Sequence, residues 1–222
     1  QYCPLMINAV HQSMTGAYGE DAILTVAHLW NDNDPAYLYD AQTLDNSLGA
    51  NGAPYLFMDL NRNYDTNYTK SAIDKNIQAR LDEVTTRGGI AVNSKYYAEE
   101  GYIVLNATVK AAQTTEFRIG AWLLEDGIYA KQTNATEEWM NTHDNAIRQR
   151  VSSDDISGVD LGTLAVGETK STALTLNIIG NKWNRDNLKV MVIVSAKNAK
   201  GQFEVANVAI CPMNDVVTYD YK

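Results

Sequence analysis

No apolar run in this 222-residue sequence approaches the roughly 20 residues that a membrane-spanning helix needs. Basic residues are also few, since 18 Lys and Arg stand against 27 Asp and Glu and leave a net charge of −9. A chain with this balance lacks the basic surface that binds nucleic acid or anionic lipid. We therefore expect no nucleic-acid partner.

Cysteine and histidine are scarce, with two and three copies. Cys3 and Cys211 lie at opposite ends of the sequence and are predicted to be separate thiols, with one disulfide between them as the alternative. His11, His28 and His143 lack the spacing of a metal site, so we interpret them as structural or surface residues. Walker and G-x-S-x-G motifs do not occur. We predict no metal site and no cofactor.

The first 87 residues alternate between helical and short apolar segments. Asp34 and Pro35 form an N-cap and first-turn pair that begins a helix. Helical patterns are present in three segments: residues 4–18, 35–48 and 69–86. Short apolar runs typical of buried strands in a parallel sheet occur in two segments: residues 22–30 and 52–60.

From Gly88 onward the apolar residues alternate instead of following a helical period. Four segments show this pattern or a continuous apolar run, and turn residues separate them. They are residues 102–110, 116–127, 173–178 and 188–196. We predict an antiparallel β-sandwich over residues 88–222 and a separate first domain over residues 1–87. The expected fold class is α/β plus all-β.

The order of elements in the first domain is helix, strand, helix, strand, helix. A parallel layer with right-handed crossovers begins with a strand, so we expect a further strand before Gln1. Cys3 then lies in the first turn of the first helix, where helix N–H groups and the macrodipole stabilise a thiolate. The alternative for Cys3 is a small, buried apolar side chain.

Two short motifs in the first domain resemble the thioredoxin fold. The stretch "QYCP", residues 1–4, is similar to the second half of a W-C-x-x-C-P signature. The stretch "GAPY", residues 52–55, is similar to the loop whose proline is cis and faces the cysteines. The resemblance covers residues 1–87 and implies an incomplete thioredoxin-like domain that lacks its first strand. It also implies a Cys immediately before Gln1, itself preceded by Trp.

A thioredoxin-like domain implies thiol-disulfide exchange with protein or peptide substrates. In this resemblance Cys3 is the second, resolving cysteine, and Cys3 and Pro54 are the catalytic residues. Ala53 and Tyr55 are the substrate-binding residues, because the backbone beside a cis proline is free to pair with an incoming chain. The alternative for Pro54 is an ordinary proline that precedes a strand.

The stretch "THDNAIRQRV", residues 142–151, is similar to an H-N-x-x-R-type stretch. Together with the two motifs and the β domain, it resembles the thioredoxin-like outer-membrane lipoproteins of Bacteroidetes, the twenty-eight-kilodalton outer-membrane-protein family. The resemblance implies an exported protein of the periplasm, outer membrane or cell surface, with a lipid anchor outside this sequence as its only membrane attachment. The alternative function is a non-catalytic surface lipoprotein whose β-sandwich serves in binding or adhesion.

Overall fold

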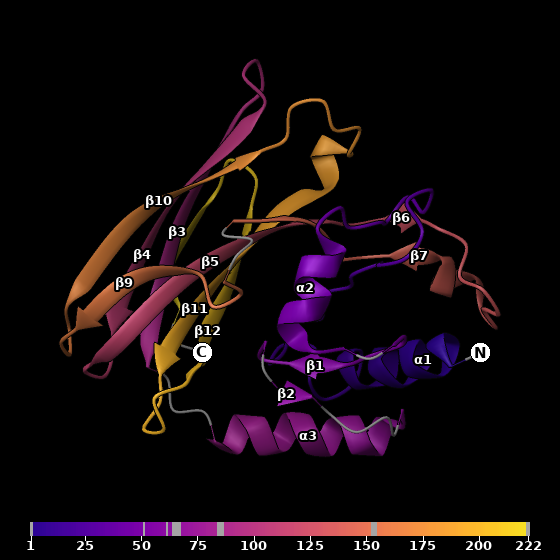
Figure 1. Cartoon of the computed structure of the whole chain (residues 1–222), viewed down its shortest axis with the longest axis horizontal. Coiled ribbons are helices and arrows are strands. Elements are labelled where there is room, and N and C mark those ends of the chain that lie inside the picture. Colours follow the sequence, from indigo (N-terminus) through magenta and orange to yellow (C-terminus); the bar gives the residue numbers. More distant parts are fainter. Residues whose placement is uncertain are drawn as a thin grey trace.

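Two β-sheets packed face to face form the larger part of the protein, and a helical layer covers one of them (Figure 1). The computed structural model describes residues 2–50, 52–60, 62–63, 68–83, 87–151 and 155–220. The sandwich begins at Gly88, and the elements before it belong to the helical layer.

The first sheet has four antiparallel strands in the order β10, β4, β3, β13. These strands are β3 (Gly88–Tyr97), β4 (Tyr102–Ala111), β10 (Thr169–Asn177) and β13 (Val216–Asp220). Strand β4 is paired on both sides, and each of its residues has a partner in β3. The hairpin of β3 and β4 therefore forms the centre of this sheet.

The second sheet is built around β5, which pairs with β11 along most of its length. Its strands are β5 (Thr115–Glu125), β8 (Ala146–Arg150), β9 (Val159–Leu164), β11 (Leu188–Lys197) and β12 (Phe203–Pro212). Strands β8 and β9 share the second edge of β5, at its C-terminal and N-terminal halves. The shorter elements are β6 (Ile128–Tyr129), β7 (Thr142–His143) and the 3-10 helices Glu138–Asn141 and Arg185–Asn187.

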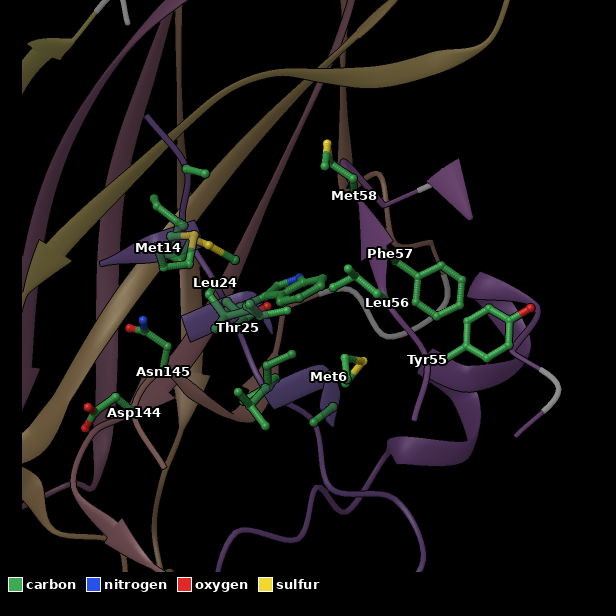
Figure 2. Close-up of a pocket in the computed structure, with 18 of the residues that line it drawn as sticks. Met6, Met14, Leu24, Thr25, Tyr55, Leu56, Phe57, Met58, Asp144 and Asn145 are labelled. Atoms are coloured by element: carbon green, nitrogen blue, oxygen red, sulfur yellow. The ribbon is translucent and has the colours of Figure 1, made fainter. Parts of the chain in front are cut away.

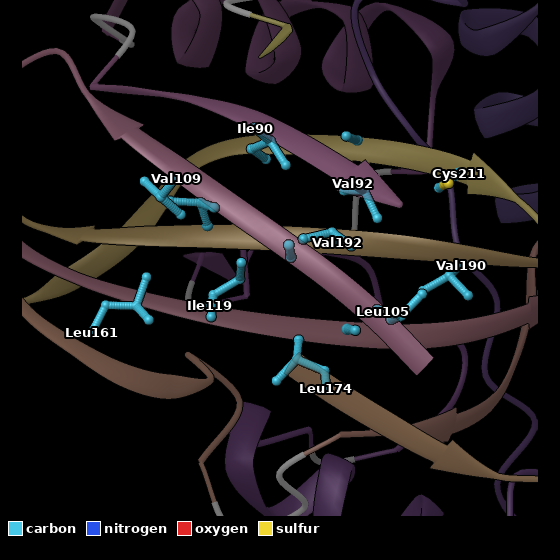
Figure 3. Packing of buried hydrophobic residues seen from close by; sticks show 14 of the residues in the cluster. Ile90, Val92, Leu105, Val109, Ile119, Leu161, Leu174, Val190, Val192 and Cys211 are labelled. Carbon is cyan, nitrogen blue, oxygen red and sulfur yellow. The ribbon is translucent and has the colours of Figure 1, made fainter. Parts of the chain in front are cut away.

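The core between the sheets consists of the residues that the alternating pattern directs inward (Figure 3). In β4 the inward residues Ile103, Leu105 and Val109 have no exposed surface, so the predicted alternation is confirmed. Cys211 also lies in this core, and burial raises the pKa of its thiol. Cys211 and Cys3 are both free thiols, which confirms the prediction that they are separate.

The outer face of the five-stranded sheet is covered by α2 (Ala41–Leu48) and the residues before it. Leu38 and Leu44 are buried against Trp122 and Ile193 of the sheet. This second cover explains why β11 is an almost continuous apolar run, since both faces of the strand are buried.

A pair of helices, α1 (Cys3–Met14) and α3 (Lys70–Glu83), forms the remainder of the helical layer. Their contact buries Ala9, Val10 and Ile77, as the predicted amphipathic patterns require. A short hairpin packs beside them and consists of β1 (Phe57–Met58) and β2 (Arg62–Asn63).

The second predicted helix begins six residues later than Asp34 and Pro35 indicate. The Asp34 carboxylate accepts a hydrogen bond from the backbone N–H of Ala36 at 2.8 Å and so caps a turn instead of a helix. Tyr37 then pairs with His28 in a single parallel bridge, which keeps the chain out of the helical conformation. The helix α2 therefore starts only at Ala41.

The two strands predicted in the first domain are much shorter than expected. Residues 22–30 make only isolated parallel bridges, in which Val26 pairs with Ala146 and His28 with Tyr37. In residues 52–60 only Phe57–Met58 is a strand, because the following Asp59 has a left-handed φ of 51° and turns the chain into β2. Both predicted strands were too long. A strand needs a neighbouring strand to pair with, and apolar composition does not show whether one is present.

Gly158 lies against the backbone of β5 and has a φ of +97°. A methyl group there would overlap the carbonyl group of Ile119. We expect Gly158→Ala to lower the free energy of unfolding by about 2–4 kcal/mol, because left-handed strain and overpacking add. Gly167→Ala is the matched control, since Gly167 has a φ of +82° and open space around it. Equal losses in urea unfolding of the two variants would contradict this prediction.

Candidate functional site

Cys3 is the first residue of α1 and is partly exposed. The Ala53-Pro54 peptide bond is cis, as predicted, and Ala53 is exposed while Pro54 and Tyr55 are half-buried. All four residues line one hollow of about 1590 Å³, so the structure brings the predicted site residues to the same cavity. Gln1, the first residue of the "QYCP" motif, lies outside the described residues.

Tyr68 contacts the Pro54 loop, and no sequence motif indicated it. Its hydroxyl donates a hydrogen bond of 2.7 Å to the Pro54 carbonyl oxygen. Burial raises the pKa of Tyr68, and negative charge on Cys3 and Tyr55 raises it further. The phenol therefore stays protonated, and remains a donor, when Cys3 is a thiolate.

Apolar side chains line the hollow between α1, β1 and the segment that follows α1 (Figure 2). Met6 of α1, Leu24 of the segment after α1, and Leu56, the residue before β1, point toward the same space. The rings of Tyr55 and Phe57 stack beside it with their centroids 5.0 Å apart. Such walls suit the apolar side chains of a polypeptide segment better than a polar small molecule.

A second group of polar residues borders this hollow on the side of the sandwich. The Nδ1–H of His28 donates to the Asp34 carboxylate at 2.7 Å, and the rings of His28 and His143 meet edge to face with centroids 4.5 Å apart. His143 is buried, and its Nε2–H donates to the Ala130 carbonyl oxygen at 3.0 Å. The interpretation of His28 and His143 as structural or surface residues did not include this contact, because the two residues are far apart in the sequence.

The pKa of His143 is lowered, mainly by burial and also by the charge of His28. The unfolded chain then takes up the proton more readily than the folded one. His143 therefore does not change the free energy of unfolding above about pH 6.5, and it lowers this free energy as the pH falls from about 6.5 toward the lowered pKa. We expect His143→Gln to lose stability less steeply with acid between about pH 7 and 5, as measured by urea titration at each pH. Identical slopes for the two proteins would contradict this assignment.

Two buried arginines of β8 hold the helical layer on the sandwich. Arg148 pairs with Glu125 at 2.7 Å and donates to the Pro35 carbonyl oxygen, also at 2.7 Å. Arg150 donates two hydrogen bonds to Asp40, the residue that precedes α2. Within the described ranges no group of three or more His, Cys, Asp or Glu side chains is arranged to hold a metal ion.

These features define the protein as an antiparallel β-sandwich that carries a helical layer with a thiol and a prolyl loop at one cavity. The family "Outer membrane protein Omp28" matches residues 41–214, which is most of the chain. The chain belongs to this family, which confirms the resemblance to the twenty-eight-kilodalton outer-membrane-protein family. Membership supports a location in the cell envelope. No helix in the described part of the chain has the length and apolar character needed to cross a bilayer.

One solved structure, "HBP35 of Porphyromonas gingivalis", is similar to 96% of this chain over 71% of its own length, with a TM-score of 0.74 and 16% identity. At this identity the likeness shows the fold alone. A match to the GH3 beta-glucosidase of Bifidobacterium adolescentis covers 57% of this chain and 17% of the glucosidase chain, with 10% identity and a TM-score of 0.24. That score is too low to support an argument. No curated protein matches the sequence.

Proposed function

We propose that this envelope protein exchanges thiols and disulfides with protein or peptide substrates through Cys3. The observation that carries the proposal is the cavity shared by Cys3 and Pro54, with the thiol at the start of α1 and the loop held by a hydrogen bond from the Tyr68 phenol. Residues 1–87 are the thioredoxin-like domain in this proposal. Residues 88–222 are the β-sandwich, which docks the protein or presents the substrate.

The walls of the hollow support a further strand in this domain. The backbone N–H and C=O of Val26 bond to Asn145 and Ile147 at 3.1 and 2.8 Å. In an extended chain the residues on either side of Val26 therefore direct their backbone N–H and C=O groups away from Asn145 and Ile147. On the far side of the hollow, Met58 of β1 has its strand partner in β2. We propose that the strand expected before Gln1 lies between these two segments and completes a thioredoxin-like sheet.

The proposed exchange uses two cysteines, of which Cys3 is the second. The thiolate of the first cysteine, expected before Gln1, attacks a substrate disulfide, forms a mixed disulfide and releases one substrate thiolate. The Cys3 thiolate then attacks the sulfur of the first cysteine, which releases the second substrate thiolate and leaves an intramolecular disulfide. Ala53 and Tyr55 hold the substrate chain during both steps through their backbone groups.

The direct test is reduction of insulin disulfides by dithiothreitol in the presence of the intact protein, including the residues before Gln1. We expect the protein to accelerate the precipitation of the insulin B chain. The control is the same protein after alkylation of its thiols with iodoacetamide. A rate equal to that of dithiothreitol alone would reject the proposal and favour a non-catalytic surface lipoprotein that binds through its β-sandwich.

The residue before Gln1 is a second, simpler test. A cysteine at that position, preceded by tryptophan, is expected from the W-C-x-x-C-P signature. Any other residue would leave Cys3 without the partner that the two-cysteine reaction needs, and would count against the proposed exchange.

A further inference from the structure

Tyr68 precedes a helix that packs on the helix of Cys3. It lies two residues before α3, whose first turn is fixed by Thr69, since the Thr69 carbonyl accepts from Ile73 at 3.1 Å. Helix α3 packs on α1 through Ile73 and Val10. The backbone of Tyr68 is therefore fixed relative to the helix that carries Cys3.

The hydroxyl of Tyr68 contacts the Pro54 loop. Its hydrogen bond to the Pro54 carbonyl oxygen occupies an acceptor of the loop backbone. Proline has no backbone N–H, so the Pro54 peptide can offer a substrate no donor either. Ala53 is exposed, so its backbone is the part of the loop that a substrate can reach.

We propose that Tyr68 is a positioning residue of this site, whose hydroxyl holds the Pro54 loop beside Cys3 so that an extended peptide aligns with the thiol. This inference rests on the proposed function, because positioning matters only if a peptide disulfide reacts at Cys3. The raised pKa of Tyr68 agrees with this role, since the phenol keeps its proton while the thiolate reacts.

Two disulfide probes separate positioning from simple exposure of the thiol. One is 5,5′-dithiobis(2-nitrobenzoate), and the other is a short extended peptide whose single cysteine carries a 2-nitro-5-thiobenzoate group. In both reactions Cys3 loses its proton to solvent, its sulfur forms a disulfide with the probe, and yellow 2-nitro-5-thiobenzoate leaves. Cys211 is fully buried, and a Cys3→Ser variant of the 222-residue chain supplies the blank.

Tyr68→Phe removes only the hydroxyl and should slow the reaction with the peptide probe about fivefold, the effect of one neutral hydrogen bond. The reaction with the small probe should stay within about twofold, because a small molecule does not need the loop. Tyr18→Phe is the matched control, since the Tyr18 hydroxyl bonds to Gln78 of α3 at 3.3 Å and not to the Pro54 loop. Equal slowing with both probes, or no slowing with either, would overturn the inference.

Failure of the proposed function would give a different result with the two probes. In that case wild-type Cys3 would favour the peptide probe over the small probe no more than free cysteine does. The placement of Tyr68 is then tested without any exchange reaction, by NMR titration of its labelled ring in the wild type and in Cys3→Ser. We expect the pKa of Tyr68 to be lower in Cys3→Ser, and an unchanged pKa would overturn the placement beside Cys3.

Discussion

Replacing Cys3 with serine should reduce insulin reduction by the intact protein to the rate of dithiothreitol alone. A serine hydroxyl cannot attack the mixed disulfide under these conditions, because thiol-disulfide exchange needs a thiolate and the serine oxygen stays protonated. The first cysteine of the proposed pair can still attack the substrate. In a reaction without dithiothreitol the mixed disulfide should therefore accumulate and be visible as a higher band on a non-reducing gel.

Cys211→Ala is the matched control for this experiment. Cys211 lies in the core of the sandwich, and burial raises the pKa of its thiol, so it has no access to a substrate. The variant should reduce insulin as fast as the wild type once its fold is verified by circular dichroism. If Cys3→Ser is as active as the wild type, Cys3 has no catalytic role.

The sandwich could be predicted well because its signal is local. In β5, as in β4, every second side chain faces the other sheet, so Phe117 and Ile119 are buried in the positions that the alternation assigns to them. The continuous apolar run of β11 also had a direct interpretation, namely a strand covered on both faces. The pattern could not predict that α2 covers the outer face of this sheet, because the sequence of α2 does not indicate which sheet it packs on.

The helical layer was predicted less well because long-range contacts override local signals there. Asp34 and Pro35 have the residue types of a helix start, yet the Asp34 carboxylate binds His28 and the N–H of Ala36, and the helix begins at Ala41. Residues 22–30 have the composition of a strand but are paired at only two positions. A strand requires neighbours along its whole length, and composition alone does not provide them.

The candidate site shows the same division. Cys3 and Pro54 could be selected because each belongs to a short motif, and the structure places both at one cavity. Tyr68 and the contact between His28 and His143 carry no motif, because they depend on residues that come together only in the folded chain. Sequence patterns identify the residues of a reaction more readily than the residues that hold them in position.

Replacing Arg148 with alanine should lower the free energy of unfolding by about 3–5 kcal/mol, the range for breaking a buried ion pair by removing one partner. The side chains of Arg148 and Glu125 are each only 6% exposed, so the variant leaves the Glu125 carboxylate uncompensated. It also removes the donor to the Pro35 carbonyl and thus a link between the sandwich and the helical layer. Urea unfolding followed by the fluorescence of the four tryptophans measures the loss.

Lys189→Ala is the matched control, because Lys189 pairs with Asp126, the residue next to Glu125, with side chains 23% and 35% exposed. A pair in contact with water contributes about 0–1 kcal/mol, so this variant should unfold almost as the wild type does. The double variant Arg148→Met and Glu125→Met removes both buried charges and should recover more than half of the loss. If the single arginine variant were no less stable than Lys189→Ala, the buried pair would not be what holds the helical layer on the sheet. The helical layer would then have to be held by the Arg150–Asp40 hydrogen bonds and by the apolar contacts of Leu38 and Leu44.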